Sequence, residues 1–298
     1  IISTKDPVQK MAKAYPLYHS LYPFIVKNLR RILKNQKPDL MVIDQINLAA
    51  FDVATEFQIP YIVWSLGGFG FIGLEDDVYI PNGISGQRKK DLTFWNRFYY
   101  KFIHPLKMFY YLFYLDLEFN YKLRKELGVK PYLIPLEKVN KHLNIITSFF
   151  GFEYPRKVSS LTYHVGMILP NKNITLSEKD KKLKEWLDQA GRENYFVIYI
   201  SFGTMVSVKS EYIMKLIQGI SLLNNTKILL ALRKPVLDRI FLPKLPQNVR
   251  LENWVNQRMV LNHPSVKVFV THCGIQSVAE GIDAAKPMLT IPVYFLIK

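Results

Sequence analysis

Short apolar runs alternate with helical patterns along most of the chain, and this alternation restricts the possible folds more than any other feature. The runs are four to six residues long, which suits strands buried on both faces. They lie at residues 40–43, 61–64, 144–147, 163–166, 195–200, 227–232, 249–252, 266–270 and 288–291. Helical patterns lie at residues 20–35, 48–57, 94–127, 183–189, 211–223 and 276–285. Strands that alternate with helices form parallel sheets, so the sequence predicts two doubly wound α/β domains.

A polar stretch divides the 298 residues into two halves. Residues 169–180 include Pro170, Asn171 and Asn173 and contain no apolar run, which predicts a linker. The expected domains are therefore residues 1–168 and 181–298. A chain of this length is typical of about two domains.

Composition and charge exclude several classes of protein. Hydrophobic residues make up 49% and charged residues 21%, which excludes a disordered chain. The formal charge of +16 is spread evenly, with 22 basic and 14 acidic residues in 1–168 and 18 and 10 in 169–298. A nucleic-acid-binding arm would concentrate this charge, whereas an anionic substrate or membrane surface fits a diffuse excess. The single cysteine, Cys273, excludes an internal disulfide.

The segment from residue 266 to residue 280 has the pattern of a phosphate site. A strand is followed by Gly274, which permits a tight turn, and a helix starts immediately after it. The unpaired N–H groups and the dipole of such a helix start favour an anion, and His272 adds a possible donor. Ser277 and Glu280 are three residues apart and share a helix face, where a carboxylate suits ribose hydroxyls.

Two further strand ends supply matching groups. Trp254 and Gln257 follow the run at 249–252, where an indole can stack on a base and an amide can bond its edge or the ribose. Ser201-Phe-Gly-Thr204 follows the run at 195–200 and offers hydroxyl groups. Together these segments predict receptors for a base, a ribose and a diphosphate.

The same motifs resemble those of the UDP-dependent glycosyltransferases of family 1. The resemblance rests on Trp254-Val-Asn-Gln257, His263-Pro264, Phe269-Val-Thr-His-Cys-Gly274, Ser277, Glu280, Pro287-Met288, Pro292 and Ser201-Phe-Gly-Thr204. In the first half, Tyr79-Ile-Pro81, Asp91-Leu-Thr-Phe94, Phe152-Glu-Tyr-Pro-Arg156 and Val165-Gly166 are similar to the animal and fungal branch. The resemblance covers nearly the whole chain.

The resemblance implies a GT-B fold, in which two Rossmann-like domains face a central cleft. The N-terminal domain would bind the acceptor and the C-terminal domain the UDP-sugar. Trp254 would stack on uracil, Gln257 would contact the nucleoside, and Glu280 would bind the ribose. His272, Ser277 and the Thr204 loop would hold the diphosphate. The implied donor-site residues are Ser201, Gly203, Thr204, Trp254, Val255, Gln257, His272, Gly274, Gln276, Ser277 and Glu280.

The implied reaction moves a hexosyl group, glucose or glucuronic acid, from the UDP-sugar to a hydroxyl of a small lipophilic acceptor, with inversion. Asp44, at the end of the run at 40–43, matches the carboxylate that orients and charges the family's catalytic histidine. No cofactor or metal is implied, and the chain's histidines lack the spacing of metal ligands.

Two departures from the family pattern lead to the expectation of a fragment cut at both ends. The family's catalytic histidine lies upstream of the first strand found here. Leu296-Ile297 stands where an Asp-Gln or Glu-Gln pair would hold the sugar. Membrane association at the endoplasmic reticulum would follow if an anchor lay beyond the end, and a cytoplasmic location otherwise.

Alternative readings remain open at this stage. His272 could be a turn residue, Trp254 a core residue and Asp44 a strand-end cap. Ser201 and Thr204 could cap a helix. The aromatic stretch at 98–115 fits a core and acceptor-pocket wall, or contact with a membrane surface. The competing function is an inactive or non-catalytic chain that binds nucleotide sugars as a partner subunit.

Overall fold

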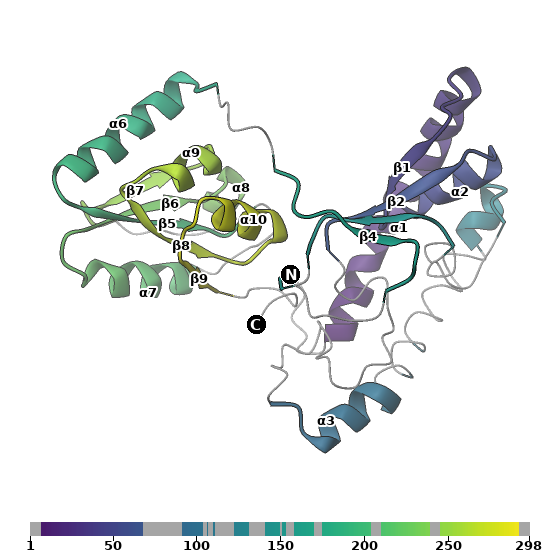
Figure 1. The fold of residues 1–298 in the computed structure, drawn as a ribbon, viewed down its shortest axis with the longest axis horizontal. Coiled ribbons are helices and arrows are strands. Elements are labelled where there is room, and N and C mark those ends of the chain that lie inside the picture. The colour runs from purple at the N-terminus through teal and green to yellow at the C-terminus, as the bar shows by residue number, and fades with distance from the viewer. Residues whose placement is uncertain are drawn as a thin grey trace. The chain divides into compact units, whose positions relative to one another are not determined.

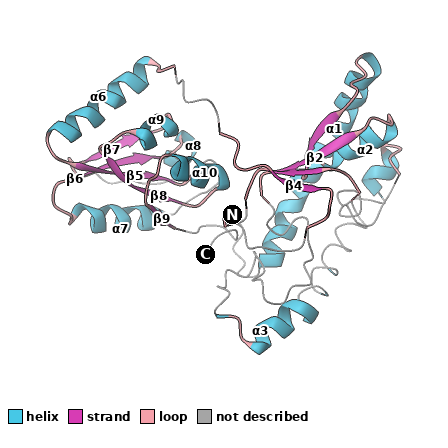
Figure 2. Ribbon diagram, viewed as in Figure 1, coloured by secondary structure: helices cyan, strands magenta, loops and turns pink. Residues whose placement is uncertain are grey.

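A computed structural model of the chain describes residues 7–67, 91–103, 106, 110, 122–130, 141–149, 151–152, 158–169, 175–203, 210–238 and 245–291. Contacts divide the chain into two compact units, Ile1–Ile168 and Leu169–Lys298. Each unit contains one parallel sheet flanked by helices (Figures 1 and 2). The predicted α/β class with two Rossmann-like domains is confirmed.

The sheet of the first unit follows the order of the sequence. Its strands are β1 (Met41–Asp44), β2 (Tyr61–Ser65), β3 (Asn144–Ile146) and β4 (Thr162–His164), paired in parallel in the order β1-β2-β3-β4. Ile43 of β1 pairs with Val63 of β2, and both are buried. Because the strands are parallel, their carboxyl ends share one edge, at which Asp44 ends β1.

The helices of the first unit differ in extent from those predicted. Helix α1 spans Pro7–Asn35, which is longer than 20–35, and continues past Pro16, a residue that interrupts helical patterns because it lacks an N–H. Helix α2 spans Leu48–Glu56. The predicted helix at 94–127 begins as α3 (Phe94–Phe98) and a π-helical turn, η2 (Tyr99–Ile103). Most of its remainder, and nearly all of the predicted loop at 75–93, lie outside the described residues.

A buried ionic network joins three segments of the first unit. Asp52 of α2 accepts hydrogen bonds from the Tyr22 hydroxyl of α1 at 2.6 Å and from Arg124 Nε at 2.9 Å. The side chains of Asp52 and Arg124 are fully buried. Burial and the adjacent Asp52 carboxylate raise the pKa of Tyr22, so its hydroxyl stays protonated and donates. The network therefore fixes α1 and α2 against the segment that contains Arg124.

The second sheet has its central strand first in the sequence. The strands are β5 (Phe196–Ser201), β6 (Thr226–Ala231), β7 (Val249–Glu252), β8 (Val266–Thr271) and β9 (Met288–Thr290). All pair in parallel in the order β7-β6-β5-β8-β9. The chain runs outward from β5 to β7 and then returns to β8 on the other side of β5. The strand order therefore reverses between β5 and β8, and in open α/β sheets ligands bind beside the carboxyl ends of the strands at such a point.

Both faces of the second sheet are covered. Residues Val197 and Tyr199 of β5 belong to one apolar cluster with Leu187 of α6 (Glu178–Arg192). Ile198 and Ile200 belong to another with residues of α7 (Ser210–Ser221). Successive strand residues point to opposite faces. Figure 1 accordingly shows α6 and α7 on opposite sides of the sheet.

Three helical segments of the second unit depart from the prediction. Helix α6 begins at Glu178, inside the predicted linker, because Ser177 and Asp180 form a reciprocal capping box. The short helices α8 (Lys234–Leu237) and α9 (Gln257–Asn262) were not predicted, since so few residues show no clear periodicity. Helix α10 spans Ile275–Asp283, close to the predicted 276–285.

No helix within the described part of the chain is long and apolar enough to span a membrane.

Replacing Arg124 by Met should destabilise the protein by about 3–5 kcal/mol, because it leaves the buried Asp52 carboxylate without its cation. Urea denaturation measures this change. The control is Arg31→Met on the exposed side of α1, which should change the free energy of unfolding by less than about 0.5 kcal/mol. Equal unfolding midpoints for the two variants would contradict the assigned role of Arg124.

Candidate donor site

The loops after β5 and β8 hold an imidazole ring between two glycines. A Cβ atom added to Gly203 would lie 2.3 Å from Cε1 of His272, and one added to Gly274 would lie 2.7 Å from its Nε2. Gly203 also has a left-handed φ of +68°. Both positions therefore require glycine if His272 is to keep its place at the sheet edge.

The His272 imidazole favours its neutral form. Burial lowers its pKa, and the nearby Ser201 backbone partly opposes this shift. At neutral pH the ring therefore acts as a neutral hydrogen-bonding group. Its Nδ1 atom has no hydrogen-bond partner among the described residues.

Helix α10 starts beside this ring with its first N–H groups uncapped by a side chain. Its N-cap is Gly274, and Cys273 before it has a left-handed φ of 65°. The N–H groups of the first turn and the positive end of the helix dipole favour a negatively charged ligand. The structure thus brings His272 and the start of α10 together at the carboxyl end of β8, an arrangement that suits a phosphate group.

Five side chains from β5, α9 and α10 form one hydrogen-bonded network. Gln257, the first residue of α9, donates from Nε2 to Glu280 Oε2 at 2.8 Å and to Ser277 Oγ at 3.2 Å. Its Oε1 accepts from the Tyr199 hydroxyl of β5 at 3.1 Å. Gln276, which is exposed, donates to the other oxygen of Glu280 at 3.3 Å. Gln257 and Glu280, two of the residues predicted to bind the nucleoside, are therefore in direct contact.

Tyr199 is the residue of this network that the sequence did not single out. Its ring is fully buried and stacks on Phe269 of β8, with the centroids 5.0 Å apart and the planes 9° apart. Burial raises the pKa of its hydroxyl, which therefore remains a donor. By donating to Oε1, Tyr199 turns the amide nitrogen of Gln257 toward Ser277 and Glu280. The available signal was a tyrosine within an otherwise apolar strand, since a buried hydroxyl needs a partner.

The loop between β7 and α9 presents an indole to solvent. Trp254 is 62% exposed, whereas the next residue, Val255, is buried in the core. Asn256 then caps α9 by accepting from the N–H of Met259. Trp254 is therefore available for stacking, which excludes the reading of it as a core residue. Because the Val255 side chain is buried, any contact from Val255 to a nucleotide comes from its main chain.

The remaining predicted residues have mixed outcomes. Ser201 is buried at the end of β5, and Thr204 lies outside the described residues. Asp44 belongs to the first unit, where its Oδ1 accepts from the N–H of Ile46 at 3.0 Å. That contact is the turn cap considered from the sequence, and the pairing with a histidine stays a prediction. Among the described residues no cluster of side chains could hold a metal ion.

The profile of the family described as UDP-glucoronosyl and UDP-glucosyl transferase matches residues 5–295. This chain belongs to that family. Its relatives include the UDP-glycosyltransferase stmC of Aspergillus ustus, 26% identical over 317 residues that cover 95% of this chain and 56% of that protein. UDP-glucuronosyltransferase 3A1 of Xenopus laevis is 25% identical over 290 residues, or 90% of this chain and 51% of that protein.

Solved structures of glycosyltransferases share the fold of this chain. The glycosyltransferase of kitacinnamycin aligns with a TM-score of 0.59 and 17% identity over 98% of this chain and 66% of that one. A UGT transferase from Siraitia grosvenorii, solved in complex with UDP, aligns with a TM-score of 0.57 and 16% sequence identity. The alignment covers 94% of this chain and 68% of that one. These likenesses show a GT-B fold. The family member described here spans about half the length of the curated relatives it matches.

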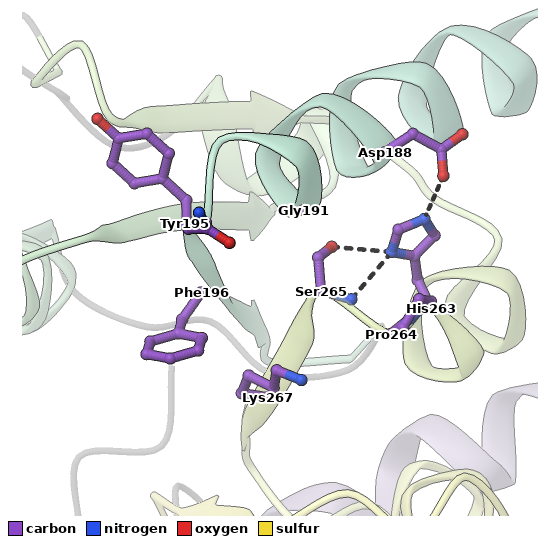
Figure 3. Close-up of a pocket in the computed structure, with 9 residues that line it drawn as sticks. Asp188, Gly191, Tyr195, Phe196, His263, Pro264, Ser265 and Lys267 are labelled. Atoms are coloured by element: carbon purple, nitrogen blue, oxygen red, sulfur yellow. Dashed lines mark hydrogen bonds and ion pairs between the residues drawn. The ribbon is translucent and has the colours of Figure 1, made fainter.

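A hollow of about 440 Å³ lies in the second unit, away from the predicted donor-site residues (Figure 3). It is near the amino ends of β5 and β8, where Phe196 and Lys267 line it. His263 lies beside it, with Nε2 2.9 Å from Asp188 Oδ1 of α6 and Nδ1 2.8 Å from Ser265 Oγ. These bonds tie α6 to the turn before β8. These bonds make His263 a structural residue.

Replacing Gly203 by Ala should weaken UDP binding by about tenfold or more, because the new methyl group displaces His272 and the left-handed φ disfavours Ala. Calorimetric titration with UDP checks this. Gly219→Ala is the matched control, since nothing lies within 4 Å of the added Cβ in α7. If both variants bind UDP as the wild type does, the assigned packing of His272 is wrong.

Replacing Tyr199 by Phe should weaken UDP binding by about fivefold, since one hydrogen bond that orients Gln257 is lost while the stacking on Phe269 persists. The exposed Tyr212→Phe on α7 serves as the control. The measurement is again calorimetry with UDP. Unchanged affinity in Tyr199→Phe would remove this residue from the site.

Proposed function

We propose that this protein binds a UDP-sugar in its second unit and transfers the hexosyl group, glucose or glucuronic acid, to a hydroxyl of a small lipophilic acceptor with inversion. The observation that carries the proposal is the Gln257–Glu280–Ser277 network on α10, the helix whose uncapped start lies beside His272. The exposed Trp254, three residues before Gln257, adds a group that can stack on a base. Membership of the transferase family supports the same reaction.

Each of these groups binds a different part of the UDP-sugar. Trp254 stacks on the uracil ring, and Glu280, which Gln257 holds in place, accepts hydrogen bonds from the ribose hydroxyls. The first turn of α10 and neutral His272 bind the diphosphate. These donors are already in place in the fold, so they stabilise the negative charge that grows on the leaving UDP without reorganising.

The transfer itself is a single displacement. The acceptor oxygen attacks the anomeric carbon as the bond to UDP breaks, which inverts that centre. The acceptor proton passes to a general base. In the family, a histidine serves as this base. We assign to Asp44 the role of orienting that histidine and stabilising its protonated form.

An aromatic surface supports the lipophilic nature of the acceptor. Phe94 and Trp95 of α3 are 69% and 73% exposed, and Phe102 of η2 is 51% exposed. Lys101 accompanies these rings in the same segment. Such a mixture suits an apolar molecule or an anionic membrane surface from which lipophilic acceptors are taken up.

The competing function is a nucleotide-sugar binder without transferase activity. Incubation of the chain with UDP-glucose or UDP-glucuronic acid and a panel of phenolic and sterol acceptors separates the two. Acceptor-dependent release of UDP supports transfer. If the chain binds UDP but no acceptor in the panel causes release of UDP from the UDP-sugar, the result favours a binder without transferase activity.

The donor site should prefer UDP over ADP, GDP and CDP in calorimetric titrations. Trp254→Ala should weaken UDP binding by about 1–3 kcal/mol through lost stacking. Glu280→Ala should also weaken it, through the ribose. Wild-type affinity equal for all four diphosphates would contradict a uracil site, and unchanged affinity in Glu280→Ala would remove that residue from it.

A further inference from the structure

The loop that carries Trp254 is held by a lysine from a distant part of the second unit. Lys179, in the first turn of α6, donates from Nζ to Asn253 Oδ1 at 2.6 Å and to the main-chain carbonyl of Trp254 at 3.0 Å. Its Nζ also lies 3.1 Å from Glu252 Oε2. The ammonium group has three N–H donors, and three acceptors on consecutive residues of this loop surround it.

The carboxylate in this cluster is itself fixed. Arg250 of β7 donates from Nε and Nη2 to Glu252 Oε1, at 3.0 and 2.9 Å. The guanidinium of Arg250 lies over the ring of Trp186 of α6, 5.5 Å from its centroid. Glu252 is therefore held from β7 on one oxygen and from α6 on the other. Lys179 thus bonds to a preordered partner, which reduces the entropy lost in forming the contact.

The local sequence does not favour a lysine at this position. The first turn of a helix carries the positive end of the dipole, which disfavours a cation. The neighbouring Glu178 and Asp180 are acidic, as a helix start prefers. Lys179 reaches away from them to the loop after β7, so its role lies in the tertiary contact.

The indole of Trp254 needs this support. Val255 and Asn256 fix the C-terminal side of the loop through the core and the α9 cap. On the N-terminal side, the described contacts to Asn253 and to the Trp254 carbonyl both come from Lys179. An exposed aromatic ring stacks effectively only when its backbone is held in place.

We propose that Lys179 is a positioning residue for the donor base, which sets the plane of Trp254 by holding residues 252–254. The proposal rests on the proposed function, since it assigns how the uracil-stacking residue is held. Lys179 acts through the loop and makes no contact with the nucleotide. Its loss therefore weakens recognition of the base and leaves the diphosphate contacts of α10 intact.

The test compares Lys179→Met with Lys181→Met, a matched change on the same helix that removes only an exposed pair with Glu178. Calorimetry with UDP should show a loss of about three- to tenfold for Lys179→Met and none for the control, the range for partly exposed charge-assisted contacts. Inorganic pyrophosphate, titrated alone, should bind both variants equally. Lys179→Arg should recover part of the UDP affinity.

A second readout needs no nucleotide. Hydrogen–deuterium exchange of residues 252–257 should be faster in Lys179→Met than in Lys181→Met. Equal exchange and equal UDP affinity in the two variants would overturn the positioning role, as would a parallel loss of UDP and pyrophosphate binding. Failure of the wild type to bind UDP, with exchange still faster in Lys179→Met, would overturn the proposed function and with it the nucleotide role of Lys179.

Discussion

The parallel pairing of β5 with both β6 and β8 is the constraint on which the donor site depends. Because the chain leaves β5 toward β6 and later returns to β8, the strand order reverses between β5 and β8. Gly203 and His272 lie in the loops after these two strands, and the start of α10 follows the second loop. A different strand order would separate these groups, so the topology brings together the residues of the proposed phosphate site.

Close packing then determines the position and the protonation state of His272. The absence of a Cβ at Gly203 and Gly274 lets the ring of His272 lie against the backbone, where burial lowers its pKa. A neutral imidazole and a helix start suit the proposed binding of a diphosphate and avoid a permanent buried charge. The nucleoside side is built differently, from a fully buried tyrosine that orients Gln257 and, through it, Glu280.

Support for the site comes from elements that make no contact with the proposed ligand. Lys179 of helix α6 bonds to the loop that carries Trp254. Asp188 of the same helix contacts His263 in the turn before β8. The edge of the sheet opposite the donor site thus carries structural bonds that hold the same helix.

The sequence by itself determined the α/β class, the positions of the strands and the candidate residues around Trp254 and His272, because strand periodicity and turn glycines are local properties. It did not reveal α9, whose six residues carry no clear period, or the role of Tyr199, whose partner lies 58 residues away. It also left open whether Trp254 is core or surface. Only the tertiary structure decided these points, since strand order and hydrogen bonds between distant elements depend on how the segments pack.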